Sequence, residues 1–133
     1  MSETPTYGLK KALDIPVDAA DARVREALKN EGFGVLTEID VKDTLKTKLD
    51  VDFRPYRILG ACNPPLAHRA LTEELEIGLL LPCNVIVYEG EEAGTSVVSI
   101  LDPEKQLGVA GRDDLAPLAT EVRARMERVL ASL

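Results

Sequence analysis

Residues 56–88 read YRILGACNPPLAHRALTEELEIGLLLPCNVIVY and contain both cysteines, the only histidine and the longest apolar runs of the chain. The first part, residues 56–62, has the side-chain alternation of a strand. Asn63 then offers an N-cap oxygen, and Pro64 and Pro65 suit the first turn of a helix, where missing N–H groups cost least. We therefore predict a corner at which a strand ends and a helix begins.

The second part of this stretch, residues 78–88, is almost entirely apolar. Such a run predicts a strand that is buried on both faces. Pro82 lies within it and cannot donate a backbone hydrogen bond to a neighbouring strand, so we expect a bulge or an edge position there. The acidic, glycine-flanked loop at residues 89–94 and the β-branched run at residues 95–101 then predict an antiparallel hairpin.

Strand and helix patterns alternate along the rest of the chain. Apolar residues recur at alternate positions in residues 7–15 and 33–39, as they do in strands. They recur at helical spacing in residues 18–31, 41–49 and 115–133. The chain therefore supplies further strands and helices on both sides of the central stretch.

The helix boundaries carry specific predictions. Asp18 is expected to cap the first helix, and Gly32 to end it in the left-handed conformation. Asp113 or Asp114 is expected to cap the last helix. Residues 103–112 contain glycines and predict a connection with one helical turn.

The resulting order, β-α-β-α-β-α-β-β-α, belongs to the α+β class. It predicts a two-layer sandwich in which helices cover one face of a mixed, mainly antiparallel sheet. A length of 133 residues, of which 45% are hydrophobic, fits a single globular domain over residues 1–133, with polar residues 1–6 as a frayed end. The other face of the sheet would stay open, and a homodimer is the simplest way to cover it.

Charge and hydropathy limit the partners. The 23 acidic residues outnumber 16 basic ones, and a formal net charge of −7 repels phosphate backbones and anionic lipids. Nucleic acid is therefore not an expected partner. The sequence shows neither a secretory signal pattern nor the ~20 continuous apolar residues of a membrane helix, so we expect a cytoplasmic protein without membrane association. In the cytoplasm the two cysteines are expected to be free thiols.

A set of motifs resembles the bacterial and archaeal family catalogued as domain of unknown function 302. The motifs are LGACNP, an A-H-x-A-L helix, GLLLPCNVIVY and an Asp-Pro pair after the next strand, and the resemblance covers about residues 7–133. It implies a compact two-layer domain of the class of the TATA-binding-protein-like arrangement, a dimer, and no established activity. The family pattern falls on Cys62, Asn63, Pro64, His68, Pro82, Cys83, Asn84, Asp102 and Pro103.

If the strands that carry the two cysteines are neighbours, the two Cys-Asn motifs meet in one pocket. We expect this pocket to be lined by Cys62, Asn63, His68, Cys83, Asn84 and Asp102. Our main hypothesis is a homodimeric module that binds a small molecule or a partner chain there, rather than an enzyme. The sequence names no cofactor, because glycine-rich phosphate loops are absent.

The alternative is a thiol-redox or metal-associated accessory protein that uses Cys62 and Cys83. Together with His68 and Asp102 they are candidate zinc or iron ligands, although all four come from separate elements. Free cysteine also packs readily as a small hydrophobic residue. A cysteine–histidine enzyme would need a group that orients the histidine and an oxyanion hole, and the sequence shows no motif for either. A purely structural dimer is the third hypothesis.

Overall fold

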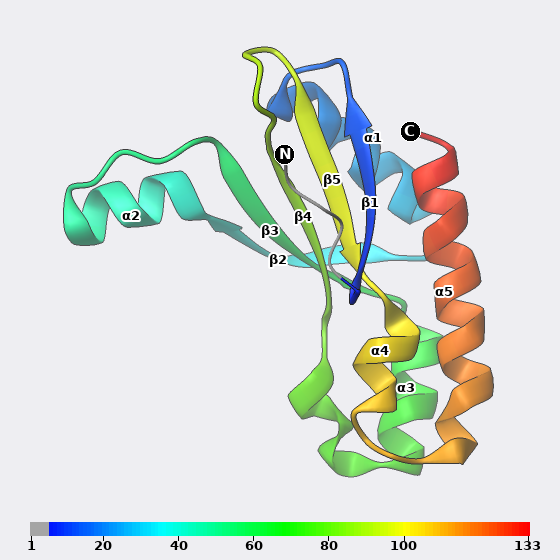
Figure 1. Ribbon diagram of the computed structural model, residues 1–133. Helices are drawn as coiled ribbons and strands as arrows, with labels where there is room; N and C mark the ends of the chain where they lie inside the picture. Colours follow the sequence, from blue (N-terminus) through cyan, green and yellow to red (C-terminus); the bar gives the residue numbers. More distant parts are fainter. Residues whose placement is uncertain (1–5) are drawn as a thin grey trace.

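A five-stranded antiparallel sheet, in the order β1-β5-β4-β3-β2, organises the computed structural model of the protein, which describes residues 6–133 (Figure 1). Its strands are β1 (Gly8–Leu13), β2 (Gly34–Asp40), β3 (Tyr56–Cys62), β4 (Cys83–Glu89) and β5 (Ser96–Leu101). All four neighbouring pairs are antiparallel, so the sheet contains none of the parallel pairing that a mixed sheet would have. The frayed end predicted for residues 1–6 lies outside the described residues except for Thr6.

Within residues 6–133, five α-helices and two short 3₁₀ helices accompany the strands. They are α1 (Val17–Asn30), α2 (Val41–Leu49), α3 (Pro64–Glu73), α4 (Pro103–Gly108) and α5 (Ala116–Ala131), with 3₁₀ helices η1 (Leu75–Leu80) and η2 (Asp113–Leu115). Of these, α4, η2 and α5 all follow the last strand. The predicted order of elements is confirmed, and α4 occupies the connection for which one helical turn was expected. The α+β, two-layer class is confirmed as well. No helix within residues 6–133 combines the length and the hydropathy needed to cross a membrane.

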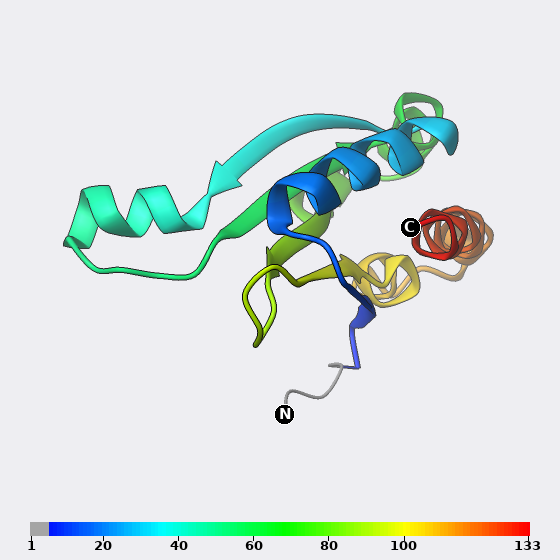
Figure 2. The ribbon, with the colours of Figure 1, turned by 90° about the horizontal axis from the view of Figure 1, so that it is seen from above.

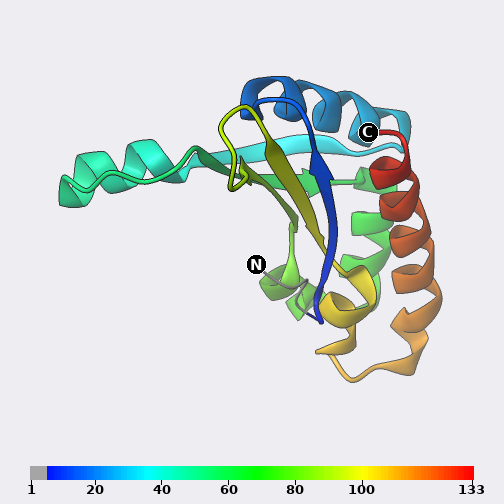
Figure 3. The same cartoon turned by 45° about the horizontal axis from the view of Figure 1, so that its top comes forward.

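One core lies between the sheet and the helices α1 and α5, which pack on the same face (Figures 2 and 3). The strands contribute aliphatic side chains at alternate positions, as the pleat of a half-covered sheet requires. The fully buried side chains of this core include Leu59, Val85, Val87, Val98, Ile100, Val24, Leu28, Met126 and Val129. The sheet, α1 and α5 therefore form the packed core, and the remaining elements are attached to it.

The first part of the predicted fourth strand is not a strand. Residues 75–80 form the 3₁₀ helix η1, a cis peptide bond joins Leu81 to Pro82, and β4 begins only at Cys83. Nor is β4 buried on both faces, because Val85 is fully buried while Asn84 is exposed. A short apolar run has the same composition in a strand and in a 3₁₀ turn, so periodicity could not distinguish them.

Two predicted helix caps are wrong, and the two predicted at Asn63 and Gly32 are confirmed. Helix α1 begins after Pro16, so Asp18 lies inside the first turn, and its carboxylate accepts a hydrogen bond from Arg57 instead of capping. No side chain caps α5, which begins after Leu115, and the carboxylate of Asp114 instead accepts from Arg112 Nε at 3.0 Å. Gly32 follows α1 with φ +85°, the left-handed conformation that was expected.

Helix α2 stands apart from the rest of the molecule and projects away from it in all three ribbon views (Figure 1, Figure 2 and Figure 3). It has the bounds that the sequence predicts, and Asp40 caps it by accepting from the backbone N–H of Asp43 at 2.9 Å. None of its residues is buried, and Leu49 is 65% exposed. The apolar stripe of α2 therefore has no core of its own chain to pack against.

Candidate ligand-binding cavity

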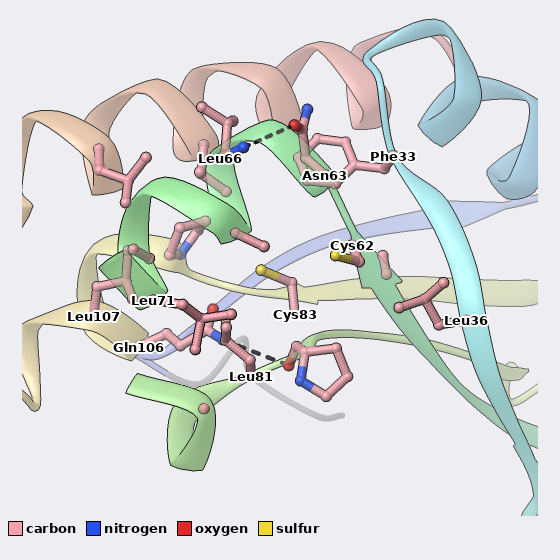
Figure 4. Close-up of a pocket in the computed structure, with 18 of the residues that line it drawn as sticks. Phe33, Leu36, Cys62, Asn63, Leu66, Leu71, Leu81, Cys83, Gln106 and Leu107 are labelled. Carbon is pink, nitrogen blue, oxygen red and sulfur yellow. Dashed lines mark hydrogen bonds between the residues drawn. The ribbon is translucent and has the colours of Figure 1, made fainter. Parts of the chain in front are cut away.

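A cavity of about 360 Å³ lies where the ends of β3 and β4 meet helices α3, α4 and α5 (Figure 4). Its wall is almost wholly apolar, and no charged residue is among the described residues that line it. The larger apolar side chains that line it are Phe33, Leu36, Leu66, Leu71, Leu81, Leu107, Leu118 and Val122. The cavity is partly open, with the exposed side chains of Leu36 and Leu71 among its lining.

The predicted corner between β3 and α3 forms one wall of this cavity. The backbone N–H of Leu66 donates to Oδ1 of Asn63 at 3.3 Å, and the N–H of Ala67 donates to the carbonyl oxygen of Asn63 at 2.8 Å. Pro64 occupies the first position of the helix and needs no partner for a backbone N–H. This local geometry turns Leu66 and Ala70 toward the cavity.

A β-bulge in β2 forms the opposite wall. Val35 pairs with Ala61 and Thr37 pairs with Gly60, so Leu36 is the extra residue between them. The absence of a side chain at Gly60 allows Thr37 of β2 to approach β3 closely, because a Cβ atom at Gly60 would lie 2.2 Å from Oγ1 of Thr37. The isolated glycine in a strand pattern was the available signal for this bulge.

The two cysteines reach the cavity from neighbouring strands. Ala61 of β3 pairs with Cys83 of β4, so Cys62 is one residue from that pair. Both thiols are free and half-buried, and Figure 4 draws both sulfur atoms at the cavity. Burial raises the pKa of Cys83 to about 11; the neighbouring Gln106 side chain opposes this rise and Cys62 adds to it. Cys83 is therefore a neutral thiol at physiological pH and contributes a weakly polar surface to the wall.

Gln106, on α4, is a cavity residue that the sequence analysis missed. It is 5% exposed, and its Nε2 donates to the carbonyl oxygen of Leu80 and, at 3.5 Å, to that of Pro82. It thus ties α4 to the segment that leads into β4. The signal available was a polar residue between Pro103 and Leu107 on the apolar side of a short helix.

Three of the six predicted pocket residues, Cys62, Asn63 and Cys83, line the cavity, and the structure does not bring the other three to it. His68 is exposed on α3, two positions after Leu66 and thus on another side of the helix. Asn84 follows Cys83 in β4 and points to the open face of the sheet, because side chains alternate along a strand.

Asp102, the last of the six, is buried but fully engaged. One carboxylate oxygen accepts from the backbone N–H of Glu104 at 2.9 Å and caps α4. The other accepts from Nη1 of Arg123 at 2.7 Å and ties α4 to α5. Its role in this structure is to hold the helices that carry the cavity wall.

The candidate metal ligands are not assembled into one site. Within residues 6–133 the structure contains no group of three or more histidine, cysteine, aspartate or glutamate side chains placed to hold a metal ion. Cys62 and Cys83 share the cavity, but His68 is exposed elsewhere on α3 and Asp102 is paired with Arg123. The four residues therefore do not provide a ligand set.

The fold and the cavity define a two-layer α+β domain with an apolar pocket at one end of its sheet. The chain matches the family described as "Domain of unknown function DUF302" over residues 9–133 and belongs to that family. Its structure is similar to the crystal structure of an uncharacterized conserved protein DUF302 from Bacillus stearothermophilus, with a TM-score of 0.88 and 31% sequence identity, covering 96% of this chain and 98% of that chain. No curated protein matches the sequence. The resemblance seen in the sequence is thus confirmed.

Proposed function

We propose that this domain binds a small, mainly apolar molecule in the cavity between the sheet end and helices α3, α4 and α5. The observation that carries the proposal is a space of about 360 Å³ with an uncharged lining. Protein interiors are close-packed and hold few voids larger than a water molecule. Ligand pockets commonly occupy ~300–1,000 Å³ and have mainly apolar walls, so this cavity has the size and the chemistry of a small-molecule site.

The state of Cys83 favours binding over thiol chemistry. A thiolate is the reactive form of cysteine, and burial raises the pKa of Cys83 to about 11. The alternative of a thiol-redox protein rests on Cys62 and Cys83 sharing one cavity. A wall that contains the neutral Cys83 thiol and aliphatic groups, however, suits an apolar ligand better than it suits a nucleophile.

Native mass spectrometry of gently purified protein, with the denatured mass beside it, tests the binding proposal. An added mass that is lost on denaturation identifies a retained ligand. Ala70, which is 3% exposed, lines the cavity from α3, so Ala70→Leu fills part of the space. We expect that variant to lose the added mass, whereas Ala131→Leu at an exposed site on α5 retains it. Retention of the ligand by Ala70→Leu would place it elsewhere.

We also propose that the protein is a homodimer that uses the α2 arm, defined as residues 40–55. A helix of nine residues is marginal in water without tertiary packing, and α2 buries none of its residues. Leu49, Val51 and Phe53 are 65%, 43% and 43% exposed. A second copy is a suitable cover because the arm carries four basic residues against four acidic ones, so its own charge does not oppose pairing with another arm.

Light scattering coupled to size-exclusion chromatography tests the dimer. Phe53→Asp places a charge on the α2 arm and is expected to give a monomer. Leu75→Asp is the matched control, because Leu75 is 82% exposed on η1, away from the arm. A monomeric wild-type protein, or a Phe53→Asp variant that stays dimeric, would contradict the assignment of the arm as the interface.

A further inference from the structure

The side-chain amide of Gln106 makes hydrogen bonds through its nitrogen but not through its oxygen. Its Nε2 donates to the carbonyl oxygens of Leu80 and Pro82, and these oxygens can only accept hydrogen bonds. The two carbonyls therefore fix which end of the amide is nitrogen. The other end, Oε1, is buried and has no hydrogen-bond partner within the described part of the chain. Gln106 itself is 5% exposed, so the unpaired oxygen is shielded from solvent.

The side chain that carries this oxygen belongs to the wall of the apolar cavity. Gln106 lines the cavity, and Figure 4 shows its side chain beside Cys83 and Leu81. The other amide in the wall, Asn63, already accepts a hydrogen bond from the backbone of Leu66 through its own oxygen. Among buried side-chain acceptors of the cavity in residues 6–133, Oε1 of Gln106 is the one left unpaired. Buried polar groups in native proteins nearly always have a partner, so an unpaired one calls for an explanation.

We propose that the cavity takes a neutral, mainly apolar molecule that carries one hydrogen-bond donor, an N–H or an O–H, and that this donor binds Oε1 of Gln106. The inference rests on the proposed binding function and adds the chemical class of the ligand. An anion or a cation would lose its hydration without gaining a countercharge, because no charged residue is among the described residues that line the cavity. Gln106 is thus a specificity-determining residue.

Two pairs of probes test this inference by isothermal titration calorimetry on the intact chain. Indole and benzofuran have nearly the same shape, and only indole has an N–H; cyclohexanol and chlorocyclohexane provide the same comparison without an aromatic ring. We expect the member of each pair that carries the donor to bind about tenfold more tightly, because the other member leaves the buried acceptor unpaired. Gln106→Met removes the acceptor at similar volume and should reduce this ratio to about one, while Lys105→Met, an exposed neighbour on α4, should preserve it.

The outcomes separate the inference from the function on which it rests. Equal binding within both pairs would overturn the role of Gln106 and leave the apolar cavity as a binding site. Failure of all four probes to bind would overturn the proposed function and the inference with it. If Gln106→Met does not fold, the ratio of affinities within each probe pair is measured on the wild-type protein alone. The side-chain amide signals of Gln106 in nuclear magnetic resonance then give a second test, because they should shift more with indole than with benzofuran.

Discussion

Ala61 and Cys83 face one another across β3 and β4, and this pair brings the two Cys-Asn motifs to the same end of the sheet. Cys62 and Asn63 follow Ala61 at the point where β3 gives way to α3. Cys83 is the first residue of β4, directly after the cis peptide bond at Pro82. Two segments about twenty residues apart in the sequence thus contribute to one cavity wall.

Cys83 should react slowly with alkylating reagents. Burial raises its pKa from 9.0 to about 11, which lowers the thiolate fraction near neutral pH ~100-fold. A thiolate of higher pKa is more nucleophilic, so the net effect is a rate ~10-fold below that of an ordinary thiol. The measurement is the iodoacetamide rate at pH near 8 in Cys62→Ser protein, folded and in denaturant. Equal rates in the two states would show that the thiol is not protected.

The same thiol predicts a loss of stability at alkaline pH. The unfolded chain releases this proton near pH 9.0, whereas the folded protein holds it up to about pH 11. The folded state therefore binds more protons in this window, and its free energy of unfolding falls as the pH rises through it, by about 2–3 kcal/mol from this group. Urea titrations of wild-type and Cys83→Ala protein at each pH give the contribution as a difference. Parallel pH curves for the two proteins would contradict it.

Gly60→Ala should destabilise the domain. The added Cβ would lie 2.2 Å from Oγ1 of Thr37 and 2.8 Å from Cγ of Pro82, so β2 or the cavity wall has to move. Overpacking of this kind costs about 1–3 kcal/mol. Gly34→Ala is the matched control in the neighbouring strand, because a Cβ at Gly34 meets no atom within 4 Å. Chemical denaturation of both variants measures the difference, and equal midpoints would show that the contact is not tight.

Arg123→Met should destabilise the junction of α4 and α5 more than the same change at Arg128. The Asp102 side chain is 5% exposed and would lose the Nη1 donor that lies 2.7 Å away. Because Arg123 is 33% exposed, water can screen part of the loss, and we expect a decrease of about 1–2 kcal/mol in the free energy of unfolding. Arg128 is 59% exposed, and its pair with Glu31 should contribute less than about 1 kcal/mol. Urea denaturation of both variants tests this order, and the reverse order would contradict it.

Local signals predicted the elements whose cause is local. Asn63 followed by two prolines specifies a helix start by capping and by a missing donor, whatever surrounds it, and the structure has that corner. The hairpin between β4 and β5 follows in the same way from its polar loop between two β-branched runs. These features need no knowledge of distant residues.

The parts that sequence analysis missed depend on distant contacts. Residues 75–80 are apolar enough for a strand, but in the structure they form a 3₁₀ helix that packs against α3 and α4. Gln106 joins the cavity because the chain brings Leu80 and Pro82 to α4. His68 and Leu66 lie on different sides of α3. A prediction that misjudges which side of a helix faces inward therefore assigns a solvent-exposed residue to the pocket.

The strand order β1-β5-β4-β3-β2 also determines when each strand can find its partner during synthesis. The first strand pairs with the last one, with Gly8 opposite Leu101 and Leu13 opposite Ser96. Lys11 also donates to the backbone oxygens of Leu130, in α5, and of Leu133, which follows it. A ribosome makes the chain from its N-terminus, so β1 remains without its partner until β5 has emerged. The sheet edge at β1 is therefore completed only after the residues up to Leu101 have left the exit tunnel.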